Sequence, residues 1–435
     1  MTAIATELRS AEPRTRGEGT VALTLWALLI GAAAVWGMIL LSANERILLG
    51  VPPLMGDFDP RVGGIAIAAT LAMLALWLAP RFATTLPWRQ LLWASFAAAA
   101  AWAVALAVID GPSGLVRPLE SRFEYLHDLP LVGSPSTFLD GFVDHIDRYT
   151  THVRSHPPGF LLALWSLDRV GLGGSGAAAA LVIAGGAAAG PAVLAALRET
   201  AGEARARAAA PFVALAPAAI WMATSADALF AGVAAWSAAL SILATGEDGR
   251  RSDALALAGG ILFGASLFLS YGVVLLALVP LTVAVVRRRF RPIAVAAAGT
   301  TLVLLALGSA GFWWLEGLSA TRREYAESIA RFRPYAYFLV ANLAAFALAI
   351  GPATAGALAR LRQPSVRLLV GGALAAVAVA NLSGLSKGEV ERIWLPFAPW
   401  IIAACAGLST GLRRGWLAAQ LSTGLIVQSL VRTSW

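Results

Sequence analysis

The sequence predicts an all-α protein that crosses a membrane many times. Hydrophobic residues make up 58% of its 435 residues and charged residues only 13%, whereas soluble domains are about half apolar and a quarter charged. Apolar runs of about 15 to 24 residues recur along the chain, and about 20 residues let a helix span the hydrocarbon core. The runs lack period-2 alternation, so we expect helices, which satisfy their own backbone groups in lipid.

The first apolar run, 20–43, follows a polar segment, residues 1–19, and has no small-residue exit typical of signal cleavage. We therefore expect a cytosolic tail and a retained helix that opens a transmembrane domain over 20–435. The run at 160–170 is too short to span, so we expect an interfacial helix over about 157–170. About thirteen crossings remain. The other runs lie near 63–80, 90–110, 176–197, 209–223, 226–244, 254–269, 272–286, 293–311, 337–357, 368–384, 393–409 and 415–431.

Clusters of arginine between the runs predict the orientation of the protein. Cytoplasmic loops are enriched in Lys and Arg, and membrane orientation explains the net charge of +8 better than a nucleic-acid partner does. We therefore expect a multi-pass plasma-membrane protein with its N-terminus inside, and with residues 44–62, 111–156, 312–336 and 385–392 outside. The clusters are Arg81 and Arg89; Arg198, Arg205 and Arg207; Arg250 and Arg251; Arg287, Arg288, Arg289 and Arg291; Arg360, Arg362 and Arg367; and Arg413 and Arg414.

The longest polar interruption, residues 111–156, holds all four histidines of the chain, His127, His145, His152 and His156. Histidine titrates near neutral pH and binds metals, so the segment marks where solvent and chemistry meet. A zinc hydrolase is disfavoured, because H-E-x-x-H is absent and the stretch around His152 is expected to be extended before Pro157. The single cysteine, Cys405, excludes an internal disulfide framework.

Aromatic and aliphatic residues recur at helical spacing within that segment, opposite several aspartates. Phe138, Phe142, Ile146 and Tyr149 form this stripe, which predicts an amphipathic helix lying on the membrane surface. A helix that only closes the outer face of the protein is the alternative.

Two stretches of the polar segment resemble the first outer loop of the family C (GT-C) glycosyltransferases. They read RFEYLHDLP at 122–130 and RYTTHVRSHPPGFLLALW at 148–165. In protein O-mannosyltransferases and the lipid A aminoarabinose transferase, an acidic residue of this loop is followed by His-Pro-Pro or Lys-Pro-Pro. Three later stretches are similar to family elements in the same order: 217–230, 264–272 and 391–396. The adjacent Asp-Glu pair and a hairpin Lys of the family are missing here, and residues 1–90 match nothing in it.

The resemblance implies transfer of a sugar from a polyprenyl-phosphate donor to a hydroxyl of an envelope glycan, glycolipid or protein on the extracytoplasmic side. A base must take the proton of that hydroxyl, and a carboxylate in a partly dehydrated cleft gains basicity. Glu124 is the first candidate. Asp128 is the second, as a base or as a group that orients the acceptor or a metal; Glu120, Asp57 and Asp59 follow. A solvated loop carboxylate is the alternative for each.

Negative charge develops on the leaving polyprenyl phosphate, and cations near the membrane surface would stabilise it. The second outer loop supplies Arg322, Arg323, Arg331 and Arg333, which alternatively anchor the flanking helices with Trp313, Trp314, Tyr335 and Tyr337. The other candidates for this substrate site are His156, Asp227, Lys387, Glu391 and Arg392. Arg392 alternatively forms only an ion pair with Glu389 or Glu391. Asp227 either faces the same cavity or caps the helix that follows it.

Two other functions remain open. A transporter or lipid flippase is a common role for many-helix chains, but we find no internal repeat and the ionisable residues gather at helix ends. A GT-C-like assembly partner would keep the helices and lose the base. The abundance of Ala, Gly and Arg suggests a GC-rich bacterial genome, in which mannose or arabinose is a plausible donor sugar. No cofactor is established, and a divalent cation is an option.

Overall fold

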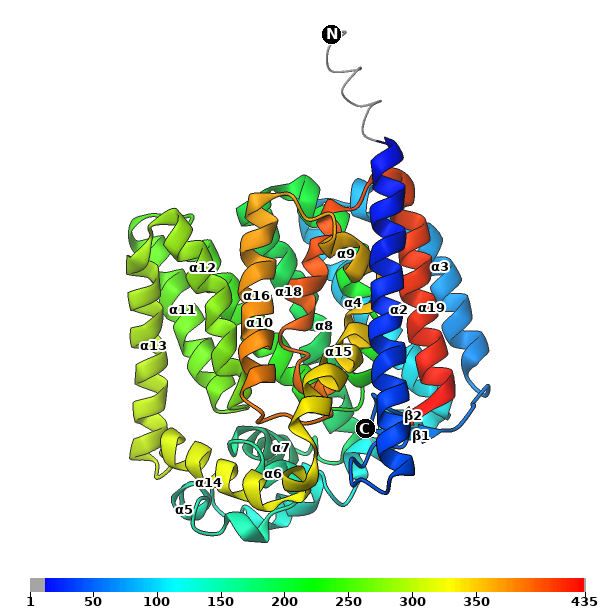
Figure 1. Cartoon of the computed structure of the whole chain (residues 1–435). Helices are drawn as coiled ribbons and strands as arrows, with labels where there is room; N and C mark the ends of the chain where they lie inside the picture. Colours follow the sequence, from blue (N-terminus) through cyan, green and yellow to red (C-terminus); the bar gives the residue numbers. More distant parts are fainter. Residues whose placement is uncertain (1–11, 434–435) are drawn as a thin grey trace.

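The computed structural model describes residues 12–433, and these are almost entirely helical (Figure 1). Eight described helical segments are long and apolar enough to cross a membrane, so the protein is an all-α membrane protein. Their bounds are Gly19–Ser42 (within α2, Glu12–Ser42), Ile65–Thr85 (α3), Trp88–Asp110 (α4, Trp88–Ala107, with a 3-10 turn), Ser175–Ala201 (α8), Asp227–Ala244 (α10), Phe290–Ser309 (α13), Tyr335–Leu358 (α15) and Pro364–Leu382 (α16).

Shorter or more polar helices fill the rest of the described chain. They are α5 (Pro135–Gly141), α6 (Thr151–Arg154), α7 (Gly159–Arg169), α9 (Glu203–Ala214), α11 (Gly249–Leu267), α12 (Leu278–Arg287), α14 (Trp314–Glu327), α17 (Val390–Ile393), α18 (Ala398–Ile402) and α19 (Arg413–Leu430). Every apolar run expected to be helical contains a helix. Helix α2 begins at Glu12 and its apolar span at Gly19, so the first turns of the helix fall within the expected tail; residues 1–11 of that tail lie outside the described part of the chain.

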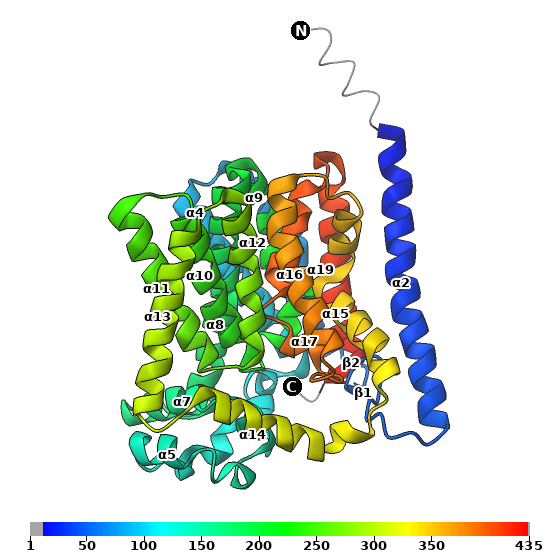
Figure 2. The same cartoon turned by 60° about the vertical axis from the view of Figure 1, so that its left-hand side comes forward.

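The long helices run side by side as a bundle, and α5, α6, α7 and α14 gather at one end of it (Figures 1 and 2). We call this end the loop end. The four segments expected to share one face, 44–62, 111–156, 312–336 and 385–392, all lie there, whereas α2 begins beyond the opposite end. Segments distant in sequence therefore meet in one place.

The centre of the bundle is formed by α8 and α10, of whose apolar windows 67% and 72% are buried, against 11% for those of α2 and α3. Small residues bring the two central backbones into direct contact: a Cβ at Gly232 would clash with the carbonyl of Gly185. Close approach of this kind is how helices associate where lipid supplies no hydrophobic drive. The start of α10 is therefore held firmly relative to its neighbours.

A small antiparallel sheet joins the segment after α2 to the C-terminal end of the described chain, at the loop end. Strand β1 (Gly56–Phe58) pairs with β2 (Val431–Thr433), with Asp57 opposite Arg432. Arg61 strengthens the join through an ion pair with Asp110. The sequence predicted helices alone, because strands of three residues are too short to show a period.

The helix expected over residues 138–149 is wrong. Helix α5 ends at Gly141, turns follow, and the apolar stripe packs inward instead of lying on a membrane surface. Phe142 stacks on Tyr149 at 5.1 Å between ring centroids and meets Phe312 edge-on at 5.8 Å. The aromatic residues thus join the first and second loops, and this contact outweighs helical periodicity. The extended stretch expected around His152 is also wrong, since residues 151–154 form one helical turn, α6.

Helix α15 is interrupted in the middle of the bundle, and a side chain of α19 forms hydrogen bonds with the backbone at the interruption. Gly351 has φ +76° and precedes Pro352, so the helical hydrogen-bond ladder stops there. The Gln420 side chain supplies the missing hydrogen bonds. Nε2 of Gln420 donates to the Ile350 carbonyl at 2.7 Å, and Oε1 accepts from the Ala353 amide at 3.1 Å. One buried amide satisfies a donor and an acceptor that lipid cannot satisfy.

We predict that Gln420→Leu destabilises the protein, because two buried backbone groups lose their partner at a cost of about 1–3 kcal/mol each. The measurement is thermal unfolding of the purified chain in mild detergent. Gln90→Leu is the matched control, since Gln90 is exposed on α4, and its unfolding should stay near wild type. Equal unfolding temperatures for the two variants would contradict the role assigned to Gln420.

Candidate functional site

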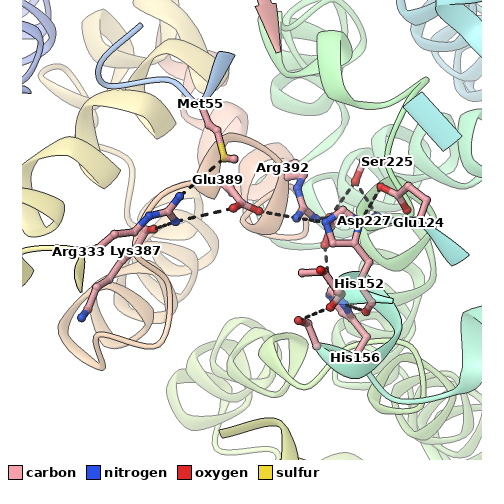
Figure 3. Close-up of polar contacts among 12 residues, drawn as sticks. Met55, Glu124, His152, His156, Ser225, Asp227, Arg333, Lys387, Glu389 and Arg392 are labelled. Atoms are coloured by element: carbon pink, nitrogen blue, oxygen red, sulfur yellow. Dashed lines mark hydrogen bonds and ion pairs between the residues drawn. The ribbon is translucent and has the colours of Figure 1, made fainter. Parts of the chain in front are cut away.

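Six charged or titratable side chains form a connected, largely buried network at the loop end (Figure 3). They come from the first loop, from the start of α10 and from the turn that contains α17. We call this network the charged cluster. Its members are Glu124, His152, His156, Asp227, Glu389 and Arg392.

The first loop contributes Glu124 and the two histidines through a series of short local contacts. Glu124 has extended backbone angles and immediately precedes a 3-10 helix, Tyr125–Leu131. Turn α6 is attached to the same stretch because the His152 amide donates to the Phe123 carbonyl at 3.1 Å. His156 ends that turn, and its Nδ1 lies 2.9 Å from the His152 carbonyl. The prolines 157 and 158 then open α7.

Asp227 is the first residue of α10, where a carboxylate also benefits from the helix dipole. Its side chain does not cap the helix. One oxygen, Oδ2, accepts from the Ser225 hydroxyl at 2.8 Å and from Arg392 at 2.7 Å. The other, Oδ1, lies 4.0 Å from Nε2 of His156. The structure thus supports the interpretation in which Asp227 faces a shared polar site.

Arg392 is the centre of the charged cluster. Its guanidinium contacts two carboxylates, those of Asp227 and Glu389, at 2.7 Å each. Its Nη2 also lies 3.1 Å from Nε2 of His152. A guanidinium only donates hydrogen bonds, so Nε2 of His152 must present its lone pair to Arg392.

That contact decides the tautomer of His152. With Nε2 accepting, the ring proton is on Nδ1, which donates to Oε1 of Glu124 at 2.7 Å. His152 therefore joins Arg392 to Glu124. This hydrogen bond falls on Oε1, one of the two carboxylate oxygens of Glu124. The charged cluster thus orients one oxygen of a buried carboxylate.

Burial and charge pairing set the protonation states of the other members. Burial lowers the pKa of Arg392, but Asp227, Glu389 and Glu124 outweigh it and raise that pKa overall. Burial raises the pKa of Glu389, and the positive charge of Arg392 and Arg333 reverses this and lowers it. For His156, burial lowers the pKa more than nearby Asp227 raises it, so the ring stays neutral at neutral pH.

Arg333 extends the network into the second loop. It is 6% exposed, lies 3.8 Å from Glu389, and donates to the Lys387 carbonyl. Lys387 folds back, its Nζ donating to the Ala330 carbonyl at 3.0 Å, while its amide donates to the Tyr325 hydroxyl. Burial raises the pKa of Tyr325 to about 12. The loops that hold Arg333 and Arg392 are therefore joined by ion pairs and backbone contacts.

Several predicted site residues lie outside the charged cluster. Asp128 is buried, but its carboxylate accepts from the Thr150 amide at 2.6 Å and so braces the first loop. Arg322 and Arg323 are exposed on α14, and Arg331 is exposed over the Phe332 ring at 4.4 Å. Glu391 is fully buried on α17 beside Arg392.

The lower-ranked carboxylates also have other partners. Glu120 accepts from the Ser175 hydroxyl at 2.6 Å, Asp59 pairs with Arg432 at 2.6 Å, and Asp57 lies in β1. None of the three contacts the charged cluster. Glu124, the first candidate, is the one that the structure joins to Arg392, through His152.

Two members of the cluster received too little weight from the sequence. His152 entered only as a zinc candidate, and Glu389 only as a partner of Arg392. The signal for His152 was its spacing of four from His156, which places both rings on one face once residues 151–154 are helical. Within residues 12–433, no group of three or more His, Cys, Asp or Glu is arranged to hold a metal ion.

Comparison of the chain with models of protein families, with curated proteins and with solved structures finds no match. The function must therefore be inferred from the geometry of the charged cluster and from the resemblance in its sequence stretches.

We predict that Arg392→Met strongly destabilises the protein, by about 3–5 kcal/mol, because it leaves buried carboxylates without their cation. Adding Asp227→Asn should restore part of the loss, since the second change removes one of those charges. Chemical unfolding of the single and double variants in detergent measures the coupling. Strictly additive losses would contradict the direct pairing of Arg392 with Asp227.

We predict a stability loss at mild acid that depends on His156. Because its pKa is lower in the folded protein than its ordinary value of 6.5, the unfolded chain takes up a proton first. The stability that neutral His156 contributes is complete above about pH 6.5. Below that pH it decreases by at most about 1.4 kcal/mol per pH unit. Unfolding between pH 7.5 and 5 should therefore be less pH-dependent in His156→Gln. Identical profiles for variant and wild type would contradict this.

Proposed function

We propose that the protein is a GT-C-type membrane glycosyltransferase that moves a sugar from a polyprenyl-phosphate donor to an acceptor hydroxyl at the loop end. The observation that supports this most is the junction of Glu124 with Arg392 through His152. The two residues come from the stretches that resemble the family, and they lie far apart in sequence. A shared site is what the resemblance requires of them.

Glu124 would act as the general base of the reaction. The acceptor oxygen forms a bond to the anomeric carbon as the bond from that carbon to the phosphate oxygen breaks. The electron pair of the broken bond leaves with the polyprenyl phosphate, and the acceptor proton passes to Glu124. Burial of Glu124 keeps it poorly hydrated, and His152 holds its other oxygen in place.

Arg392 would act mainly as a positioning residue in this scheme, because its donors are already directed at Asp227, Glu389 and His152. The phosphate would instead be bound by cations of the second loop. Arg322, Arg323 and Arg331 are exposed and would contact the phosphate, whereas Arg333 and Lys387 donate to backbone carbonyls and would hold these loops in place. Interfacial arginines suit a phosphate that arrives on a lipid.

The number of crossings belongs to the same proposal. Beyond the eight long segments, we propose five further crossings made by α9 with its following 3-10 turn, α11, α12 with the turn before it, α18 with the turn after it, and α19. Helices α11 and α19 have 19 and 18 residues, and α11 packs along both α10 and α13. Because thirteen is an odd number, the N-terminus would lie on one side of the membrane, and the C-terminal strand, with the rest of the loop end, on the other.

The loop end would face outward from the plasma membrane. The arginine clusters at the start of α9, the start of α11 and the α12–α13 turn all lie at the ends of helices opposite the loop end. An excess of arginine marks the cytoplasmic side. This orientation gives the charged cluster access to lipid-linked sugars and to envelope acceptors such as glycans or glycolipids.

We predict that Glu124→Gln abolishes sugar transfer while the protein stays folded, because the amide keeps a hydrogen-bonding oxygen for His152 but cannot take a proton. The loss should be at least about 100-fold, the usual contribution of general-base catalysis. The assay is transfer from farnesyl-phosphoryl mannose or arabinose to an envelope extract. Asp144→Asn, on an exposed residue of the same loop, is the matched control.

The same assay separates the competing functions. Movement of lipid-linked sugar across vesicles without sugar transfer would favour a flippase and contradict the transferase. Binding of donor with no transfer, unchanged by Glu124→Gln, would favour a non-catalytic assembly partner. Unfolding temperature and gel-filtration profile show whether each variant is folded.

A further inference from the structure

A second polar feature lies beside the charged cluster: a cavity of about 540 Å³ at the loop end. It falls within the size range of small-molecule sites, about 300–1,000 Å³. Its wall combines the end of α4, the first loop, the turn before α10 and the C-terminal strand. The lining residues are Ala107, Asp110, Gly114, Arg117, Pro118, Glu120, Ser121, Ile220, Thr224, Gln428, Arg432 and Thr433.

The cavity adjoins the charged cluster at two points in the chain. Ser121 lines it, and the Ser121 carbonyl accepts from the Glu124 amide at 2.8 Å. Thr224 lines it too, and stands directly before Ser225, the hydrogen-bond partner of Asp227. The carboxylates of Glu124 and Asp227 do not line the cavity themselves, but the backbone that carries each of them adjoins its wall.

One buried polar group in the wall is unsatisfied. Thr224 is 5% exposed, and its hydroxyl has no hydrogen-bond partner among the described residues. Buried polar groups are almost always hydrogen-bonded, and leaving one without a partner costs about 1–3 kcal/mol. A hydroxyl of this kind in a cavity wall points to a polar ligand that completes its bonding.

The charges of the wall indicate a neutral ligand. Two arginines, Arg117 and Arg432, are matched by Asp110 and Glu120, and an amide and hydroxyls stand among them. Asp110 is itself held by Arg61 and Arg117, and Arg432 by Asp59. A wall with both signs of charge, with donors and acceptors interleaved, suits a polyhydroxyl compound better than a phosphate or an alkyl chain.

We infer that this cavity binds the acceptor as a sugar, so that the transferase elongates or branches a glycan rather than modifying a simple lipid alcohol. This rests on the proposed function. The acceptor sugar would hydrogen-bond to Thr224 and to Oε1 of Gln428, whose Nε2 already donates to Asp110, and its reacting hydroxyl would extend past Ser121 to reach Glu124. Because β2 supplies Arg432 and Thr433 to the wall, part of the specificity would come from the C-terminal strand.

The test uses the full chain in nanodiscs, with farnesyl-phosphoryl mannose and arabinose as donors. Octyl mannoside and octyl arabinofuranoside are the acceptors, with octanol as the sugar-free comparison. We expect transfer to a glycoside and not to octanol. Thr224→Val and Gln428→Leu should each raise the acceptor KM about three- to tenfold, the loss of one or two hydrogen bonds, and leave the donor KM unchanged.

A direct binding measurement keeps the inference separate from the proposed function. Saturation-transfer NMR with methyl mannoside and methyl arabinofuranoside should show binding that Thr224→Val weakens. Thr423→Val is the matched control, because its hydroxyl only bonds the Ala419 carbonyl within α19, and it should bind like wild type.

Three results would overturn the acceptor site: equal transfer to octanol, an acceptor KM unaffected by either cavity variant, or displacement of the methyl glycosides by inorganic phosphate. If the wild-type chain transfers no sugar at all, the proposed function fails, and NMR still decides the cavity. Glycoside binding weakened by Thr224→Val would then support a sugar site, and no binding of either glycoside would refute it.

Discussion

The loop end depends on the ion pairs of one buried side chain, Arg392. Its guanidinium is matched by Asp227 from the start of α10 and by Glu389 from its own turn, and it reaches Glu124 through His152. Buried charge is tolerated only when it is paired and hydrogen-bonded. The first loop, the central helix α10 and the α17 turn are thus held together by a single electrostatic junction.

The surrounding architecture explains why that junction is rigid. Helix α10 is packed backbone to backbone against α8, so Asp227 is placed by the centre of the bundle and not by a loop. The aromatic contact of Phe142 with Phe312 holds the first loop against the segment before α14, and Arg333 adds the second loop through Glu389. Three loops with few regular elements acquire a defined geometry from these contacts.

The sequence predicted the helical class and the gathering of polar loops at one end, because apolar length and arginine position report directly on membrane crossing. It also selected Glu124, His156, Asp227 and Arg392. It failed for residues 138–149, where tertiary contacts of aromatic side chains override helical spacing, and it gave no sign that Asp128 accepts from the Thr150 backbone. The cavity and the β1–β2 pair join residues that no local pattern relates.

The β1–β2 pairing has a consequence for biosynthesis. Strand β2 follows α19, so it reaches β1 only after every preceding helix has been inserted. Since Arg432 and Thr433 line the cavity, its wall closes last, on a bundle that is already in the membrane. In a chain that is still being translated, this cavity would therefore stay open until β2 docks on β1.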